Sequence, residues 1–174
     1  MIQFHLVMNK IAIVGITGAG KSTLSRRIAK KIGLPVFHMD TLFWRGEWQE
    51  VPEKEYVEAH QKILRENDRW IIEGWVSEAM ADRLRQAEVI IYLDYPGWLA
   101  AVHYVERWQK HRIVARPELP KESRDRFKFR RFFLSFFRSE RPQIEKALAQ
   151  AADPKKVVRI TSMEEMEDYL ESAF

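Results

Sequence analysis

Short runs of apolar residues recur along the chain, and segments with the 3.6-residue periodicity of helices lie between them. The runs are rich in β-branched and aromatic residues and are mostly unbroken, which is typical of strands buried on both faces of a parallel sheet. We predict strands at 11–14, 35–39, 70–72, 89–93 and 157–160, of which 35–39 is the weakest run. Strands that alternate with helices indicate a layered α/β domain with right-handed crossovers.

The helical segments fill the intervals between these runs. We expect helices at 22–32, 52–66 and 97–113. Ser162 followed by Glu165 forms a capping box, which predicts the start of a further helix near the end of the chain. Phenylalanines between 129 and 137 recur at helical spacing, and this face either packs on the domain or forms a contact between two copies. We expect one domain over residues 1–174.

Charge is unevenly distributed along the chain. The formal net charge is +4, but residues 100–142 contain twelve Lys or Arg and five Asp or Glu, and the remainder of the chain is slightly acidic. Such a basic segment can bind phosphate groups, lie on a nucleic-acid backbone or form a solvated helix face. The sequence contains no helix-turn-helix, zinc finger or other recognised DNA-binding motif.

Several classes of protein are excluded by what the sequence lacks. There is no cysteine, which rules out disulfides, thiolate chemistry and cysteine-ligated zinc. No run of about 18 apolar residues is present, so we predict no membrane span. The first ten residues do not have a signal-peptide pattern, and we expect a cytoplasmic protein.

Residues 15–22 have the sequence Gly-Ile-Thr-Gly-Ala-Gly-Lys-Ser, which matches the phosphate-binding P-loop motif. The expected strand before it and helix after it supply the context that the motif needs. Glycines allow backbone N–H groups to approach a phosphate, and the helix N-terminus adds a partial positive charge. Lys21 would reach the outer phosphates, and Ser22 would offer its hydroxyl to Mg²⁺.

Acidic residues follow three of the expected strands. Asp40, Glu73 and Asp94 come at or just after their carboxyl ends, where ligands bind in doubly wound sheets. A carboxylate there can hold Mg²⁺ or its water, or accept a proton from an attacking hydroxyl. Each can equally cap a helix, and Asp94 in particular precedes Pro96 as a helix cap would.

Arginines form the third element of the expected site, because guanidinium groups neutralise the charge of a transferring phosphoryl group. Arg107, Arg112 and Arg116 lie where the chain leaves the helix expected after the fourth strand, and Arg138 and Arg141 follow the phenylalanines. We expect two or three of them to contact nucleotide.

Four elements together closely resemble the bacterial proteins described as DNA topology modulation, or FlaR-like, proteins, which belong to the adenylate-kinase-like group of P-loop kinases. They are the P-loop, His-Met-Asp-Thr-Leu-Phe-Trp at 38–44, Arg-Trp-Ile-Ile-Glu-Gly at 69–74 and Tyr-Leu-Asp-Tyr-Pro at 92–96. The resemblance covers residues 10–148. The P-loop is common to many families, whereas Asp-x-Leu-Phe-Trp is more particular.

The resemblance implies a three-layer α/β/α fold with a five-stranded parallel sheet and a helical lid at about 112–128. Asp40 resembles the acceptor-side acid of small-molecule kinases, and Arg107 resembles the arginine that opens the lid. Glu73 stands where relatives have aspartate, and Asp94 begins an Asp-x-Pro element like that of adenylate kinases. The Gly-Phe-Pro-Arg run of true adenylate kinases is absent after Gly74, so AMP is not the expected acceptor.

We therefore predict an ATP- and Mg²⁺-dependent kinase that phosphorylates a small molecule. The alternative is a nucleotide-dependent regulator associated with DNA topology. The expected catalytic residues are Lys21, Asp40 and Arg107, and the expected magnesium residues are Ser22, Glu73 and Asp94. The expected nucleotide-binding residues are Gly15, Thr17, Gly18, Ala19, Gly20, Lys21, Ser22, Thr23, Arg107 and Arg112.

Overall fold

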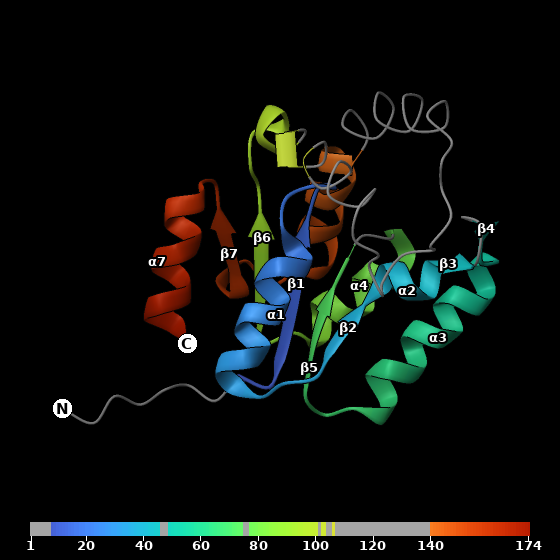
Figure 1. Cartoon of the computed structure of the whole chain (residues 1–174). Coiled ribbons are helices and arrows are strands. Elements are labelled where there is room, and N and C mark those ends of the chain that lie inside the picture. The colour runs from blue at the N-terminus through green and yellow to red at the C-terminus, as the bar shows by residue number, and fades with distance from the viewer. Residues whose placement is uncertain (1–7, 46–48, 75–76, 101, 104–105, 107–139) are drawn as a thin grey trace.

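Five parallel strands form the central sheet of the protein (Figure 1). The computed structural model describes residues 8–45, 49–74, 77–100, 102–103, 106 and 140–174. The strands are β1 (Lys10–Gly15), β2 (Val36–His38), β5 (Trp70–Glu73), β6 (Val89–Leu93) and β7 (Val157–Ile160), in the spatial order β2-β5-β1-β6-β7. All four pairings are parallel. The five predicted strands are thereby confirmed, and β1 lies at the centre of the sheet.

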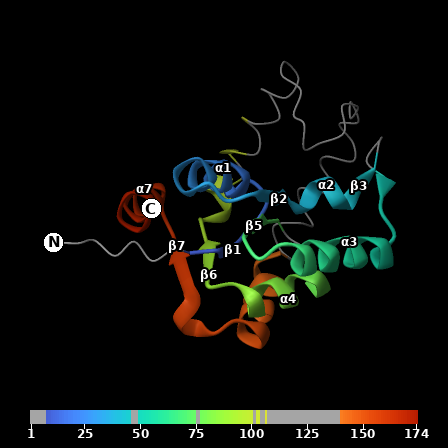
Figure 2. The ribbon, with the colours of Figure 1, turned by 90° about the horizontal axis from the view of Figure 1, so that it is seen from below.

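Helices cover both faces of the sheet, which gives three layers (Figure 2). One face carries α1 (Lys21–Ile32) and α7 (Met163–Ala173). The other face carries α3 (Glu53–Glu66), α4 (Ser77–Gln86) and the helical residues 140–151. The expected three-layer α/β/α fold is confirmed.

The core follows directly from the unbroken apolar strands. Residues 11–14, 70–72 and 90–91 are fully buried, because helices cover both sides of each strand. The helices contribute one apolar face each: α3 buries Tyr56, His60 and Leu64, which recur every four residues. Removing such side chains from water is the main term that favours folding.

Some elements were not predicted from the sequence. The short helix α2 (Met39–Phe43) begins immediately after β2, so the expected strand at 35–39 ends at His38. Two-residue strands β3 (Trp44–Arg45) and β4 (Gln49–Glu50) pair antiparallel beyond it. These elements are too short to establish a hydrophobic period. The helix α4 was missed as well.

Part of the expected architecture lies outside the described residues. This applies to the lid at 112–128, to the phenylalanine face at 129–137 and to most of the second half of the helix expected at 97–113. Within that helix, residues 97–100, 102–103 and 106 are helical. None of the helices formed by the described residues combines the length and apolar character that a membrane span requires.

The capping box predicted at the last helix is confirmed. The Ser162 hydroxyl accepts a hydrogen bond from the Glu165 N–H at 3.1 Å, and the Glu165 carboxylate accepts one from the Thr161 N–H at 2.7 Å. The first contact satisfies a backbone N–H group in the first turn of α7, and the second satisfies the N–H of Thr161, which precedes the N-cap.

We expect Ser162→Ala to lower the free energy of unfolding by about 1 kcal/mol, because one N-terminal N–H of α7 loses its acceptor. Ser162→Asp should retain most of the stability, since aspartate is also a good cap. Urea unfolding followed by circular dichroism measures both. Equal losses for the two variants would show that the hydroxyl does not act as a cap.

Candidate active site

The loop between β1 and α1 carries the P-loop motif, and its glycines have backbone angles that favour glycine. Gly18 and Gly20 have φ values of +86° and +88°, in the left-handed region. Gly18 also packs tightly: a Cβ atom built on it would lie 2.2 Å from the carbonyl oxygen of Ala100. A side chain at this position would therefore displace either the loop or the helix that begins after Pro96.

Lys21 is the first residue of α1, and its side chain turns back over the loop. Its ammonium group donates hydrogen bonds to the carbonyl oxygens of Gly15 at 2.9 Å and Ile16 at 3.1 Å. These contacts place a positive charge beside the N-terminus of α1, whose dipole has the same sign. The combination is suited to binding an anion.

A cavity of about 570 Å³ opens over this loop. This volume lies within the ordinary range for small-molecule sites. The predicted residues that line it are Thr17, Gly18, Ala19, Gly20, Lys21, Ser22, Thr23, Asp40 and Glu73. The other lining residues are Leu24, Leu93, Tyr95, His103, Glu106, Met163 and Met166. Gly15 is not among the lining residues, but its carbonyl oxygen accepts a hydrogen bond from Lys21.

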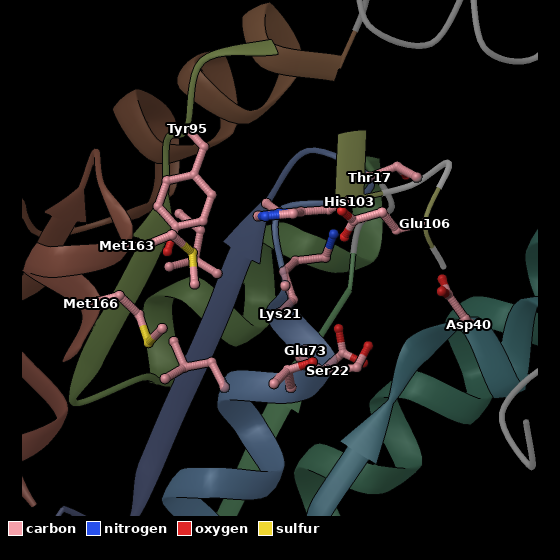
Figure 3. Close-up of a pocket in the computed structure, with 16 residues that line it drawn as sticks. Thr17, Lys21, Ser22, Asp40, Glu73, Tyr95, His103, Glu106, Met163 and Met166 are labelled. Carbon is pink, nitrogen blue, oxygen red and sulfur yellow. The ribbon is translucent and has the colours of Figure 1, made fainter. Parts of the chain in front are cut away.

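Glu73 ends β5 and is almost fully buried at the base of the cavity, beside Ser22 (Figure 3). Its Oε1 lies 2.6 Å from Nδ1 of His38, which ends the neighbouring strand β2. Burial alone would raise the pKa of Glu73, but hydrogen bonds from His38 and Ser22 and the charge of Lys21 lower it below the ordinary glutamate value. Glu73 is therefore an anion at neutral pH.

Asp40 approaches the cavity from another direction. It lies in the first turn of α2 and is solvent-exposed. Figure 3 shows Asp40 on one side of Lys21 and the apolar side chains of Tyr95, Met163 and Met166 on the other. The cavity thus has an acidic end, a basic centre and an apolar end.

Asp94 is held by arginines. Arg141 lies 2.5 Å from Oδ1, and Arg159 donates to Oδ2 at 2.7 Å through Nε. Burial alone would raise the pKa of Asp94, but these hydrogen bonds and charges lower it below the ordinary aspartate value. Because both oxygens face guanidinium groups, this arrangement does not support the magnesium role that we expected for Asp94. It is also not among the residues that line the cavity.

The remaining expected residues cannot be placed, because Arg107, Arg112, Arg116 and Arg138 lie outside the described residues. Four residues near the loop were not singled out from the sequence, namely His38, His103, Glu106 and Glu140. His38 had a signal that could have been used, because it lies near the end of a predicted strand, two residues before Asp40. Glu140 had none, since it contacts Thr17 across 123 positions of sequence.

Comparisons with known proteins agree at the level of the fold. No protein-family model matches the sequence, and no curated protein matches it. A shikimate kinase from Acinetobacter baumannii in complex with shikimate has a TM-score of 0.55 and 17% identity, covering 97% of this chain and 91% of that one. A gluconokinase from Sinorhizobium meliloti 1021 has a TM-score of 0.58 and 13% identity, covering 96% and 90%.

A sugar kinase from a Janibacter species gives a TM-score of 0.56 and 14% identity, covering 95% of this chain and 92% of its own. At such identities a structural likeness establishes the fold alone. The chain has the three-layer fold of P-loop small-molecule kinases. The narrower resemblance to FlaR-like proteins is not confirmed.

The arginine pairs of Asp94 should make stability depend on pH in the acid range. A carboxyl group whose pKa is lowered by folding stabilises the native state above its unfolded pKa of about 3.9, and this contribution is lost as the pH falls through the lower folded pKa. We expect Asp94→Asn to be less stable than the wild type at pH 7, and the difference to narrow below about pH 4.

Urea unfolding at a series of pH values between 7 and 3 measures this difference. Asp68→Asn, at an exposed position before β5, is the matched control and should follow the wild type throughout. If the difference in stability between Asp94→Asn and the wild type stays constant down to pH 3, the arginine pairs of Asp94 do not stabilise the protein through its charge.

Proposed function

We propose that the protein is an ATP-dependent kinase that transfers the γ-phosphoryl group to a small acceptor bearing a hydroxyl or phosphate group. One observation carries the proposal: the P-loop, with Lys21 and Ser22 at the start of α1, opens into a cavity whose wall also contains Asp40 and Glu73. Phosphoryl transfer needs a phosphate cradle, a counter-charge and a group that orients the acceptor within one cavity.

The nucleotide would lie along the loop. Backbone N–H groups at the loop and the α1 terminus would hold its phosphates, and Lys21 would exchange its contacts with loop carbonyls for phosphate oxygens. The nucleobase would lie at the apolar end, against Tyr95, Met163 and Met166. Met163 is 42% exposed, and methionine side chains pack well against flat aromatic rings.

Mg²⁺ would be held by Ser22 and Glu73, which lie side by side (Figure 3). The residues fit this ion, because a hydroxyl and an ionised carboxylate are the oxygen donors that it prefers. Among the described residues, no group of three His, Cys, Asp or Glu could hold a metal ion. Mg²⁺ commonly binds through one or two protein ligands, with water and substrate phosphates completing its shell. When bound, it would neutralise charge on the phosphates.

Asp40 would act on the acceptor. Its carboxylate would orient the acceptor hydroxyl and take its proton as the hydroxyl oxygen forms a bond to the γ-phosphorus. The bond between that phosphorus and the β–γ bridging oxygen breaks, and ADP leaves with the electron pair. Lys21 would stabilise the charge that develops on the transferring group, and we retain Arg107 and Arg112 as further proposed contacts to it.

The alternative of a DNA-associated regulator rests on the basic segment at 100–142, most of which lies outside the described residues. No contact among the described residues favours it over the kinase.

Lys21→Ala and Asp40→Asn test the kinase proposal directly. We expect each to lower kcat/KM by about 10²-fold or more, because each removes charge from the transferring centre. The assay incubates the protein with Mg²⁺ and γ-labelled ATP against pools of nucleosides, nucleotides, sugars and hydroxy acids. Lys30→Ala, at an exposed position on the same helix, and Asp68→Asn are matched controls and should behave as the wild type. Labelled product from both active-site variants at wild-type rates would refute the proposal.

Ser22→Ala and Glu73→Gln test the magnesium assignment. Each variant removes one proposed Mg²⁺ ligand. We expect each to raise the Mg²⁺ concentration needed for half-maximal activity by about tenfold. The measurement is a Mg²⁺ titration at fixed ATP.

His38→Gln separates charge from packing in this test. It removes the imidazole contact but leaves the Glu73 carboxylate in place, so it should change the Mg²⁺ requirement less than Glu73→Gln does. Equal effects from the two variants would assign Glu73 a packing role instead.

A further inference from the structure

Glu140 makes a two-point contact with the tip of the phosphate loop. Its Oε2 accepts a hydrogen bond from the Thr17 N–H at 2.7 Å, and its Oε1 accepts one from the Thr17 hydroxyl at 3.2 Å. Glu140 is 1% exposed and is the first described residue of the helical segment 140–151. A buried carboxyl group is costly unless it is hydrogen-bonded, so this contact is specific and not incidental.

The loop tip is held from two sides. Thr17 is fixed by Glu140, and the next residue, Gly18, packs against the backbone of Ala100 so closely that no Cβ would fit. The two supports come from different parts of the chain, one following β6 and one preceding β7. Neither residue lies in the P-loop motif itself.

The neighbour of Glu140 extends this support. Arg141 pairs with Asp94, which follows the end of β6, while Glu140 reaches the loop that follows β1. β1 and β6 are adjacent strands. Two consecutive side chains therefore fix the start of one helical segment to the ends of two neighbouring strands. The position of this segment and the shape of the loop are therefore coupled.

We propose that Glu140 is a positioning residue for nucleotide binding: through Thr17 it holds the phosphate loop in the shape that accepts phosphate. The inference rests on the proposed function. It means that a residue outside the P-loop motif contributes to the affinity of the loop for nucleotide. It also accounts for a hydrogen-bonding side chain at Thr17, whose hydroxyl and N–H are both used in the contact.

The electrostatic surroundings of Glu140 give the proposal a second observable. Burial raises the pKa of Glu140 to about 7, although the charge of Lys21 and the hydrogen bonds from Thr17 oppose this effect, and Asp40 adds to it. Among the described residues, the charged groups that act on Glu140 are therefore Lys21 and Asp40, while the adjacent Arg141 pairs with Asp94. Phosphates entering the cavity bring negative charge and favour the protonated form, so nucleotide binding should take up a proton near neutral pH.

Protonation preserves the contact. A neutral carboxyl group can accept from the Thr17 N–H through one oxygen and donate its own proton to the Thr17 hydroxyl oxygen. A glutamine side chain can do the same through its carbonyl and amide groups, but it cannot titrate. Glu140→Gln therefore separates positioning from charge, and Glu140→Ala removes both.

The experiment measures the Kd of the non-hydrolysable analogue AMP-PNP with Mg²⁺ by calorimetry at pH 6, 7 and 8, in buffers of different ionisation enthalpy. We expect Glu140→Ala to bind about tenfold more weakly than the wild type at pH 7, which is the effect of about 1.4 kcal/mol. Glu140→Gln should stay within about threefold at pH 7, since its hydrogen bonds are conserved. The wild type should bind more tightly at pH 6 than at pH 8 with proton uptake, and Glu140→Gln should lose most of both effects.

Controls separate the ways in which the idea can fail. Gln150→Ala, exposed on the same helical segment, should bind as the wild type does. If Glu140→Ala folds and binds AMP-PNP with wild-type affinity, the positioning role is wrong. If Glu140→Ala does not fold, the test is Glu140→Gln. Wild-type pH dependence and proton uptake in that variant would also overturn the proposal. Absence of AMP-PNP binding in the wild type would instead refute the proposed function.

Discussion

The burial of β1 on both faces is the constraint on which the rest of the structure depends. The strand is paired on one edge with β5 and on the other with β6, and helices cover it above and below. The enclosed part of such a strand must be apolar, as residues 11–14 are, and its neighbours must run parallel to it if helices are to connect them. All parallel strands then end at one edge of the sheet, and every loop that leaves a carboxyl end meets the others there.

Polar groups gather at that shared edge, and each of three buried acids there has a specific partner. Glu73 contacts His38, Asp94 contacts Arg141 and Arg159, and Glu140 contacts Thr17. The partners give the acids different properties. Hydrogen bonds from His38 and Ser22 and the charge of Lys21 lower the pKa of Glu73, and two arginines lower that of Asp94. Glu140 accepts hydrogen bonds from the neutral groups of Thr17, and burial raises its pKa to about 7. Three carboxyl groups close to one loop can therefore serve distinct purposes.

The features that could be predicted from the sequence are those that depend on a local pattern of residues. The five strands follow from unbroken apolar runs, and the phosphate loop follows from glycine spacing between a strand and a helix. The predictions of Asp40 and Glu73 at the cavity wall were correct as placements, because parallel strands end at one edge. The roles that we assigned to these residues are still proposals.

The sequence could not predict which residues form hydrogen bonds or ion pairs with the acids of the site. Asp94 was expected near Mg²⁺, but its charge faces Arg159, which is 65 positions away and lies on the adjacent strand. The contact between Glu140 and Thr17 spans 123 positions and involves no motif. Pairings of this kind are set by the register of strands and the placement of helices, which no local pattern specifies.

The location of Met163 and Met166 has a consequence for how the protein is made. The phosphate loop leaves the ribosome well before α7, which carries both methionines of the apolar end of the cavity. Domains generally acquire their tertiary structure as units during synthesis. During synthesis the phosphate loop is therefore present long before the pocket is complete. Bound nucleotide could stabilise a chain fully only after β7 and α7 have docked.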